Sequence, residues 1–417
     1  MTSHWHATLD ASPLPTVEFP ARAEVVVVGA GIHGAAAAYW LARTGAAPLL
    51  LDRIGPAAGA TGHNGGLCVA GTAEAYLDAV ARLGHPVARA VWSLSAAGYD
   101  QLAATIAEEE IACDWRPTGN LAFALDPGQL QGFREAATLL AADGFAMELL
   151  DRHEVQALVP TPLGPEVIGA RRNPRGASLH SARLVHGLLA AAVRHGARLC
   201  WGVEVAAVRA DGAGLLLQTS LGSLGATTVV LALNAWSADV LPDVRGVITP
   251  VRGQALATAP RAPALSCGFG ASLTPTGEYG QQTATGAVVF GGCRAVAPSR
   301  DVGARTLVPS AEVQAALDAA LGRLFPALAG APVARRWAGL MAFTSDYLPI
   351  AGADPTLPGL WYSGGFCGHG MPFAMPFGRL LADAALSGVA PSALAPFRRD
   401  RPTLAAEGPA QASRADQ

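Results

Sequence analysis

The order of apolar and polar positions near the amino terminus predicts a strand, a helix and a second strand. Val25 to Val28 is a β-branched run typical of a buried strand, and a glycine-rich turn follows it. Ala35 to Arg43 is alanine-rich and ends just before Gly45, as a helix commonly does. Leu49 to Leu51 predicts the second strand, so the pattern indicates a β–α–β unit of an α/β fold.

The remaining pattern predicts further helices and strands along the chain. We expect helices at 76–110, 128–143, 182–195, 311–324 and 377–386. We expect strands at 117–125, 202–209, 215–219, 229–233 and 360–363, with several more between 250 and 292. The segment 337–352 reads as turn-rich, residues 1–22 as an irregular arm, and residues 396–417 as a loose polar tail.

Composition narrows the class of protein. A chain of 417 residues exceeds one ordinary core, so we expect two domains or one domain with a large insertion. Hydrophobic content of 51%, charged content of 15% and a net charge of −3 favour a globular enzyme and give no reason to expect a nucleic-acid partner. The oligomeric state stays open.

Cysteine and lysine usage excludes several kinds of chemistry. The six cysteines lie far apart with no CxxC pair, which indicates neither a disulfide scaffold nor a zinc cluster and fits a reducing cytoplasm. All 29 basic residues are arginine, so Schiff-base chemistry on a lysine amine is excluded. His180, His186 and His195 follow one helix without facing carboxylates, so we expect no metal site. The pairs 171–172 and 398–399 read as solvated arginines.

We also expect no transmembrane segment. The longest apolar run, residues 25–42, is interrupted by glycines and a histidine where a spanning helix needs continuous apolar surface. Residues 1–20 lack the basic-then-apolar order of a secretory signal. Both observations fit a cytoplasmic protein.

The first glycine turn has the spacing of a dinucleotide-binding motif. The segment Gly29-Ala30-Gly31-Ile32-His33-Gly34 follows a predicted strand and opens a predicted helix. Gly29 allows the tight turn, Gly31 lets the backbone approach a pyrophosphate, and Gly34 allows close packing of strand and helix. Asp52 ends the second strand, where an acid can bind an adenosine ribose. The motif alone does not separate NAD from FAD.

Later segments carry a family resemblance when they are taken in order. They are 59–66 (Gly-Ala-Thr-Gly-His-Asn-Gly-Gly), 118–120, 179–184, 231–236, 250–254, 337–346 (Trp-Ala-Gly-Leu-Met-Ala-Phe-Thr-Ser-Asp) and 364–371 (Gly-Gly-Phe-Cys-Gly-His-Gly-Met). Together they resemble the D-amino-acid-oxidase-like flavoenzymes, in particular members similar to gamma-glutamylputrescine oxidase. The resemblance covers most of residues 24–390.

The resemblance implies FAD bound along the first domain. Val205 would contact the adenine, residues 59–66 would run beside the flavin, and residues 364–371 would cover its pyrimidine edge. The residues that it implies for FAD binding are Gly29, Gly31, Ile32, His33, Gly34, Asp52, Arg53, Ala60, Thr61, His63, Asn64, Gly65, Gly66, Val205, Asn234, Trp236, Gly339, Gly365, Phe366, Gly368, His369, Gly370 and Met371.

The resemblance also implies the domain organisation. An FAD-binding domain of the Rossmann type would be discontinuous, built from 23–80, 165–245 and 335–395. An inserted α+β substrate domain, based on an antiparallel sheet, would comprise 81–164 and 246–334. The active site would lie between them.

His63 leaves the mode of flavin attachment open. In dimethylglycine and sarcosine dehydrogenases of this family, a histidine in a similar segment attaches FAD covalently. Relatives similar to gamma-glutamylputrescine oxidase carry arginine there and bind FAD noncovalently. A cysteinyl link of the sarcosine oxidase kind is excluded, because Gly339 occupies the matching position.

Departures from the family bear on the substrate. Glycine oxidase carries an arginine that clamps the substrate carboxylate where this chain has Met341. We therefore expect an amine, or an acid bound by another arginine such as Arg294. Further predicted substrate contacts are Tyr279, Gln281 and Phe343. No general base is required for a neutral amine, and His63 and His369 are the candidate catalytic groups.

The resemblance implies oxidation of a C–N bond by hydride transfer to the flavin, with reoxidation by O2. Sarcosine-oxidase relatives activate O2 with a lysine, which this chain lacks, so a dehydrogenase that uses a quinone or another acceptor stays an alternative. A flavin-binding protein without turnover, acting within a larger complex, is an alternative of another class. A nicotinamide dehydrogenase is a third.

Overall fold

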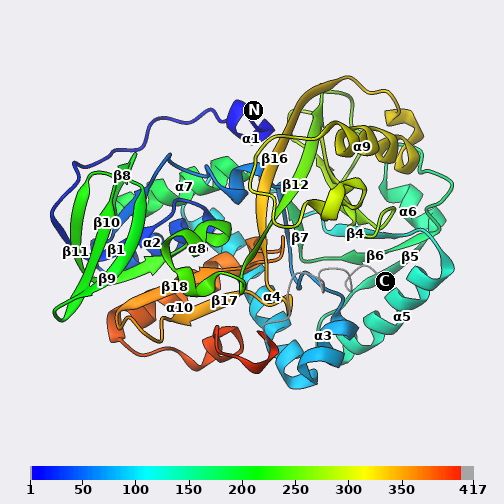
Figure 1. The fold of residues 1–417 in the computed structure, drawn as a ribbon. Coiled ribbons are helices and arrows are strands. Elements are labelled where there is room, and N and C mark those ends of the chain that lie inside the picture. The colour runs from blue at the N-terminus through cyan, green and yellow to red at the C-terminus, as the bar shows by residue number, and fades with distance from the viewer. Residues whose placement is uncertain (1, 405–417) are drawn as a thin grey trace.

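Two eight-stranded sheets organise the chain, and the computed structural model describes residues 2–404 of it (Figure 1). One sheet is largely parallel and the other largely antiparallel, so the expected α/β fold with a Rossmann-type unit and an antiparallel second sheet is confirmed. The part of the expected tail that covers 405–417 lies outside the described residues.

The first sheet has the order β17-β18-β11-β1-β2-β8, with the antiparallel pair β9 and β10 attached to β11. Its strands are β1 (Arg22–Val28), β2 (Leu49–Asp52), β8 (Arg198–Trp201), β9 (Val205–Asp211), β10 (Gly214–Thr219), β11 (Gly222–Leu231), β17 (Ile350–Ala353) and β18 (Leu360–Gly364). β1 pairs in parallel with both β11 and β2. Because both of its faces are buried, its sequence is a continuous valine run rather than an alternation.

Three helices cover one face of this sheet: α2 (Ile32–Arg43), α7 (Ser181–Arg194) and α10 (Ala374–Ser387). α2 packs between α7 and α10. Gly378 permits the close approach of α10, since a Cβ there would lie 2.7 Å from the Cβ of Ala36. In residues 2–404 no single helix is long and apolar enough to cross a membrane, and one pair, Met371–Ser387 with Ser392–Leu404, meets that test only together and with a 113° bend.

The second sheet has the order β16-β12-β15-β14-β13-β4-β6-β5. Its strands are β4 (Asn120–Ala124), β5 (Glu148–Asp151), β6 (Gly169–Asn173), β12 (Thr249–Thr258), β13 (Gly268–Ala271), β14 (Glu278–Gln282), β15 (Val288–Gly292) and β16 (Val333–Phe343). On one face, Phe123, Phe269 and Phe290 stack in a core that α9 (Ala311–Leu324) covers. The other face is free to line a cavity.

Further helices and strands lie outside the two large sheets and the helices α2, α7, α9 and α10. They are the helices α3 (Tyr76–Leu83), α4 (His85–Glu108), α5 (Pro127–Ala142), α6 (Arg152–Leu158) and α8 (Ser237–Val240), and the strands β3 (Leu67–Val69) and β7 (Gly176–Ser178). The helices expected at 76–110, 128–143, 182–195 and 311–324 are confirmed to within a few residues at each end, apart from the break at Gly84 between α3 and α4.

The two sheets divide the chain near the expected domain boundaries, with two differences. β6 and β16 both belong to the second sheet, although all of β6 and residues 335–343 of β16 fall within ranges assigned to the FAD-binding domain. β16 contributes because it pairs with β12 over ten positions, from Thr249 opposite Phe343 to Thr258 opposite Val333. The exact boundaries stay a proposal.

Two local predictions were wrong. The segment from Trp337 is not turn-rich, because residues 333–343 form the long strand β16 and the turn begins only at Thr344. The amino-terminal arm is not wholly irregular, because His4–Ala7 forms the short helix α1, capped by Ser3. Trp5 of α1 is buried in the main core.

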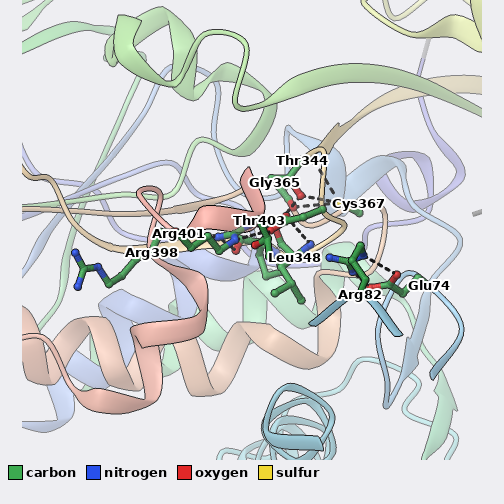
Figure 2. Close-up of polar contacts among 11 residues, drawn as sticks. Glu74, Arg82, Thr344, Leu348, Gly365, Cys367, Arg398, Arg401 and Thr403 are labelled. Atoms are coloured by element: carbon green, nitrogen blue, oxygen red, sulfur yellow. Dashed lines mark hydrogen bonds and ion pairs between the residues drawn. The ribbon is translucent and has the colours of Figure 1, made fainter. Parts of the chain in front are cut away.

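The carboxyl-terminal tail is ordered as far as the described residues reach. Phe397 is buried, and Arg401 forms a buried ion pair of 2.6 Å with Asp346. The same carboxylate accepts a hydrogen bond from the hydroxyl of Thr403, and Arg401 also donates to the carbonyl oxygen of Leu348 (Figure 2). Residues 396–404 are therefore not loose, since this ion pair attaches them to the turn after β16.

We predict that Arg401→Met destabilises the protein. Burial alone raises the pKa of Asp346, but hydrogen bonds and charge from Arg401 outweigh it and hold that pKa below its ordinary value. Removing one partner of a buried pair costs about 3 kcal/mol. Urea unfolding at pH 7 measures the loss, which should shrink as the pH falls through the folded pKa of Asp346 because the carboxylate then becomes neutral.

Arg398→Met is the matched control. Arg398 pairs with Asp400 on the surface, and more than half of each side chain is exposed. An exposed pair contributes little, so this variant should unfold like the wild type. Equal unfolding free energies for the two variants would contradict the role assigned to Arg401.

Candidate active site

A cavity of about 1390 Å³ runs from the carboxyl ends of β1 and β2 to the open face of the second sheet. Its first-sheet wall contains the glycine turn after β1, and its second-sheet wall is a set of residues on one face of that sheet. This set consists of Asn120, Ala122, Arg171, Asn173, Gly253, Gly270, Tyr279, Gly339, Met341 and Phe343. The cavity thus connects the predicted dinucleotide site with the predicted substrate site.

The glycine turn after β1 tolerates no side chain at two of its positions. Gly29 has a φ of 106°, and a Cβ there would lie 2.7 Å from the carbonyl oxygen of Ala232. A Cβ on Gly34 would lie 1.8 Å from the carbonyl oxygen of Gly29. Gly31 lines the cavity and is the N-cap of α2, so the amino end of α2 points toward the cavity. This geometry suits the approach of a pyrophosphate.

The predicted adenine end of the cavity contains Asp52, Arg53, Val205 and Trp236. One carboxylate oxygen of Asp52 accepts hydrogen bonds from the N–H groups of Ile54 and Gly55. Its other oxygen accepts one from Ala30, which leaves a lone pair for a ribose hydroxyl. The guanidinium of Arg53 lies 4.3 Å from the ring centroid of Trp236.

The backbone of residues 57–66 is held from outside by five side chains. Each donates a hydrogen bond to a carbonyl oxygen of this segment, which we call the flavin segment. Ser3 donates to Gly62 (2.6 Å), Trp5 to Asn64 (2.7 Å), His6 to Ala57 (3.1 Å), Trp337 to His63 (2.9 Å), and Gln281 to both Gly65 (3.0 Å) and Gly66. Three of these five donors come from the amino-terminal residues that were expected to be irregular.

This arrangement fixes which backbone groups face the cavity. In a trans peptide the C=O and the following N–H point in opposite directions. With the carbonyl oxygens of His63 and Asn64 bound by tryptophans, the N–H groups of Asn64 and Gly65 point away from those tryptophans. Thr61 joins the segment to α2, because its hydroxyl oxygen accepts a hydrogen bond from the N–H of Ile32. Ala60, Thr61, His63, Asn64 and Gly65 all line the cavity.

The structure separates the two predicted substrate contacts on β14. Tyr279 lines the cavity, and its ring lies so close to Gly65 that a Cβ there would come within 2.7 Å. Gln281 does not line it. Its buried amide donates to the flavin segment and accepts a hydrogen bond from Arg116 (2.8 Å). Gln281 therefore positions the flavin segment, and the same contacts make Gly66 necessary because a Cβ would lie 2.3 Å from the Gln281 nitrogen.

The glycine loop at 364–371 is fixed by hydrogen bonds to three other elements. Asn234 accepts a hydrogen bond from the N–H of Gly365 (3.1 Å). His33 of α2 donates to the carbonyl oxygen of Gly370 (2.9 Å) and stacks on Phe366 at 3.7 Å. Cys367 has a φ of 51°, and its N–H donates to Ala342 of β16 (2.7 Å). Figure 2 shows Cys367 beside Thr344. Phe366, Gly368, His369, Gly370 and Met371 line the cavity.

The three histidines of the site are neutral at pH 7. Burial lowers the pKa of His33 to about 3, against a smaller opposing effect of its hydrogen bond. Burial also lowers the pKa values of His63 and His369. His63 donates from Nδ1 to Gly59 (2.8 Å) and His369 from Nε2 to Val69 (2.8 Å), so each keeps one ring nitrogen as an acceptor.

The predicted substrate wall is aromatic and cationic. Met341, Phe343 and Arg294 line the cavity, and the Arg294 guanidinium lies 5.5 Å from the Phe343 ring centroid. Arg294 also donates to the carbonyl oxygen of Arg300. Gly339 faces His63, since a Cβ there would lie 2.5 Å from the Cβ of His63.

Comparison with known proteins agrees with this geometry. Residues 24–384 match the profile described as DAO, FAD dependent oxidoreductase. The chain belongs to the DAO family. It is 27% identical to one of the opine oxidase subunits of Agrobacterium tumefaciens, over 91% of this chain and 97% of that protein. It is 27% identical to gamma-glutamylputrescine oxidoreductase of Escherichia coli over 92% and 89%.

Solved structures support the same fold. Glycine oxidase from Geobacillus kaustophilus superposes with a TM-score of 0.79 at 24% identity, over 92% of this chain and 99% of that chain. L-proline dehydrogenase from P. horikoshii superposes with a TM-score of 0.78 at 22% identity, over 91% and 98%. As a DAO-family member the chain is an FAD-dependent oxidoreductase of amines or amino acids, and its glycine turn fits that cofactor.

Sequence reasoning missed part of the site. Ser3, Trp5 and His6 hold the flavin segment, yet isolated polar residues near a terminus give no signal of such contacts. Arg171 was expected to be solvated but lines the cavity, while Arg172 pairs with Glu148 (2.8 Å). Arg399 was also expected to be solvated, but its side chain is only 11% exposed and pairs with Asp354.

We predict that Trp5→Phe weakens FAD binding. The change keeps an aromatic ring but removes the donor to the carbonyl oxygen of Asn64, and the loss of one buried hydrogen bond raises the Kd for FAD roughly 5-fold. Flavin fluorescence titration of the apoprotein measures it. Trp40→Phe is the matched control, because the Trp40 N–H is buried and has no acceptor within residues 2–404. Equal Kd values for the two variants would argue against a role of the Trp5 hydrogen bond in FAD binding.

We also predict that His33→Gln reduces the dependence of stability on pH. Because the folded pKa of His33 is lowered, its contribution to stability is present at pH 7 and is lost as the pH falls from about 6.5 towards 3. A histidine whose folded pKa is lowered in this way contributes about 1.4 kcal/mol per pH unit to the slope of the unfolding free energy between pH 6 and 4. Urea unfolding at several pH values should give the variant a slope of unfolding free energy against pH that is smaller than the wild-type slope by the contribution of one histidine. An unchanged slope would mean that His33 is charged in the folded state.

Proposed function

We propose that this protein oxidises the C–N bond of an amine or amino acid to an imine, which water hydrolyses to a carbonyl compound. The observation that carries the proposal is the continuous cavity, which joins a DAO-family dinucleotide site to a pocket with Tyr279, Phe343 and Arg294. The relatives named for gamma-glutamylputrescine and glycine support this class of substrate.

FAD, when bound, supplies the hydride acceptor at its N5 atom. The protein's own residues bind and orient the substrate and exclude water from it. Tyr279 and Phe343 form an aromatic wall beside the Arg294 cation, whose charge disfavours an ammonium group and so favours a neutral amine. Burial raises the pKa of Tyr279 to about 12, so its hydroxyl stays protonated and can donate a hydrogen bond.

A substrate carboxylate is bound by Arg294 and not by the residue at position 341. Met341 provides an apolar contact and cannot bind a carboxylate, whereas Arg294 presents a cation to the same cavity. His63 and His369 are neutral and each keeps one ring nitrogen as an acceptor, so either could take a proton from an arriving ammonium group. Neither is required as a base if the amine arrives neutral.

FAD is held noncovalently, and O2 reoxidises the reduced flavin with release of H2O2. A covalent link would use the Nε2 atom of His63, because Nδ1 donates a hydrogen bond to the carbonyl oxygen of Gly59. Colour that stays with acid-precipitated protein would indicate that link. The absence of lysine favours a second candidate, a dehydrogenase with a quinone or dye as acceptor.

We predict that anaerobic addition of a suitable amine or amino acid bleaches the bound flavin. A panel of primary and secondary amines and of D- and L-amino acids identifies the class by the loss of visible absorbance. Admission of air should restore the absorbance and release one H2O2 per flavin. Recovery only with a quinone or dye would select the dehydrogenase, and a flavin that no compound bleaches would favour a flavin-binding protein without turnover.

A further inference from the structure

A row of paired residues crosses the cavity face of the second sheet. Tyr279 of β14 lies opposite Gly270 of β13, which lies opposite Ala122 of β4, which lies opposite Arg171 of β6. Directly paired residues project from the same face, and all four line the cavity. Adjacent strands are about 4.8 Å apart, so the backbones of Tyr279 and Arg171 are separated by about 14 Å.

The middle of this row is open. Gly270 has no side chain and Ala122 has only a methyl group, so between Tyr279 and Arg171 the sheet forms a shallow trough. Phe133 of α5 and Asn173 of β6 line the same end of the cavity as Arg171. An elongated ligand with its reacting end beside Tyr279 would therefore have its other end beside Arg171.

Arg171 has no anionic partner within residues 2–404. Its guanidinium lies 5.3 Å from the Phe133 ring centroid, and its Nε atom is buried without a hydrogen-bond acceptor in that range. Burial lowers its pKa, and no neighbouring charge opposes that effect. A half-buried cation without an anionic partner is costly, and a carboxylate that binds it in two places removes much of that cost.

The carboxylates near this end of the cavity form no ion pair with Arg171. Glu74 pairs with Arg82, as Figure 2 shows, and Asp126 caps α5 through the N–H of Gln129. Asp78 is an exposed residue of α3. The adjacent Arg172 differs from Arg171 because Glu148 neutralises it on the other face of the strand.

We propose that Arg171 binds a second, distal carboxylate of the substrate. This inference rests on the proposed oxidation and narrows its substrate class to amines or amino acids that carry an anionic group several bonds from the oxidised C–N bond. Arg294 and Tyr279 then act at the reacting end and Arg171 at the far end. Arg171 determines specificity and takes no part in the chemistry.

Binding of non-reacting acids tests the subsite without turnover. Glutarate, adipate and pimelate are titrated into the FAD-bound protein beside butyrate and hexanoate, and calorimetry gives each Kd. We expect at least one dicarboxylate to bind about 10-fold more tightly than the monocarboxylate of similar length. Arg171→Met should abolish that difference and leave monocarboxylate binding unchanged, while Arg171→Lys should restore part of it.

Arg172→Met is the matched control and should preserve the preference for dicarboxylates. The proposal is overturned if wild-type protein binds both kinds of acid equally, or if Arg171→Met and Arg172→Met weaken them alike. Retention of the visible flavin spectrum by each variant shows that it is folded. If the preference depends on Arg171 but no amine bleaches the flavin, the anion subsite stands and the proposed oxidation fails.

Discussion

The cavity depends on one constraint: the carbonyl oxygens of the flavin segment are bound from outside by side chains of three separate elements. Ser3, Trp5 and His6 come from the amino terminus, Gln281 from β14 and Trp337 from β16. Because the peptide planes cannot rotate without breaking these hydrogen bonds, the segment keeps its shape before any ligand binds. Preorganisation of this kind lowers the cost of binding and aligns the dipoles of the backbone in advance.

The same contacts join the two sheets. Gln281 and Trp337 belong to the antiparallel sheet, whereas the flavin segment follows β2 of the parallel sheet. A second connection is made by Cys367 in the loop after β18, whose N–H donates to the carbonyl oxygen of Ala342 in β16. The carboxyl-terminal residues add a third, because Arg401 binds the turn that leaves β16. The dinucleotide groove and the substrate wall are therefore held in one relative position by buried polar contacts.

The sequence was sufficient for the parts of the molecule that have a short-range pattern. The valine run of β1, the glycine turn and the alanine-rich α2 are encoded locally, and their periodicity predicted the parallel unit. β16 was missed because a strand that crosses Gly339 and ends near the Thr344 turn owes its regularity to pairing with β12, which no local pattern reveals. Arg171 was assigned to solvent because strand register decides which face a residue occupies. Gln281 lies on the same face of β14 as Tyr279, but no local pattern reveals that the flavin segment covers it there.

The glycine-lined groove is expected to hold FAD, and the adjoining cavity to bind the substrate that reduces it. The most direct measurement is a titration of flavin-free protein with FAD, followed by visible absorbance and by flavin content after gel filtration. We expect one FAD retained per chain, with a visible spectrum that ligands of the cavity perturb. Protein that retains no flavin, or retains it without a spectral response to any such ligand, would show that the groove and the cavity do not act together on FAD.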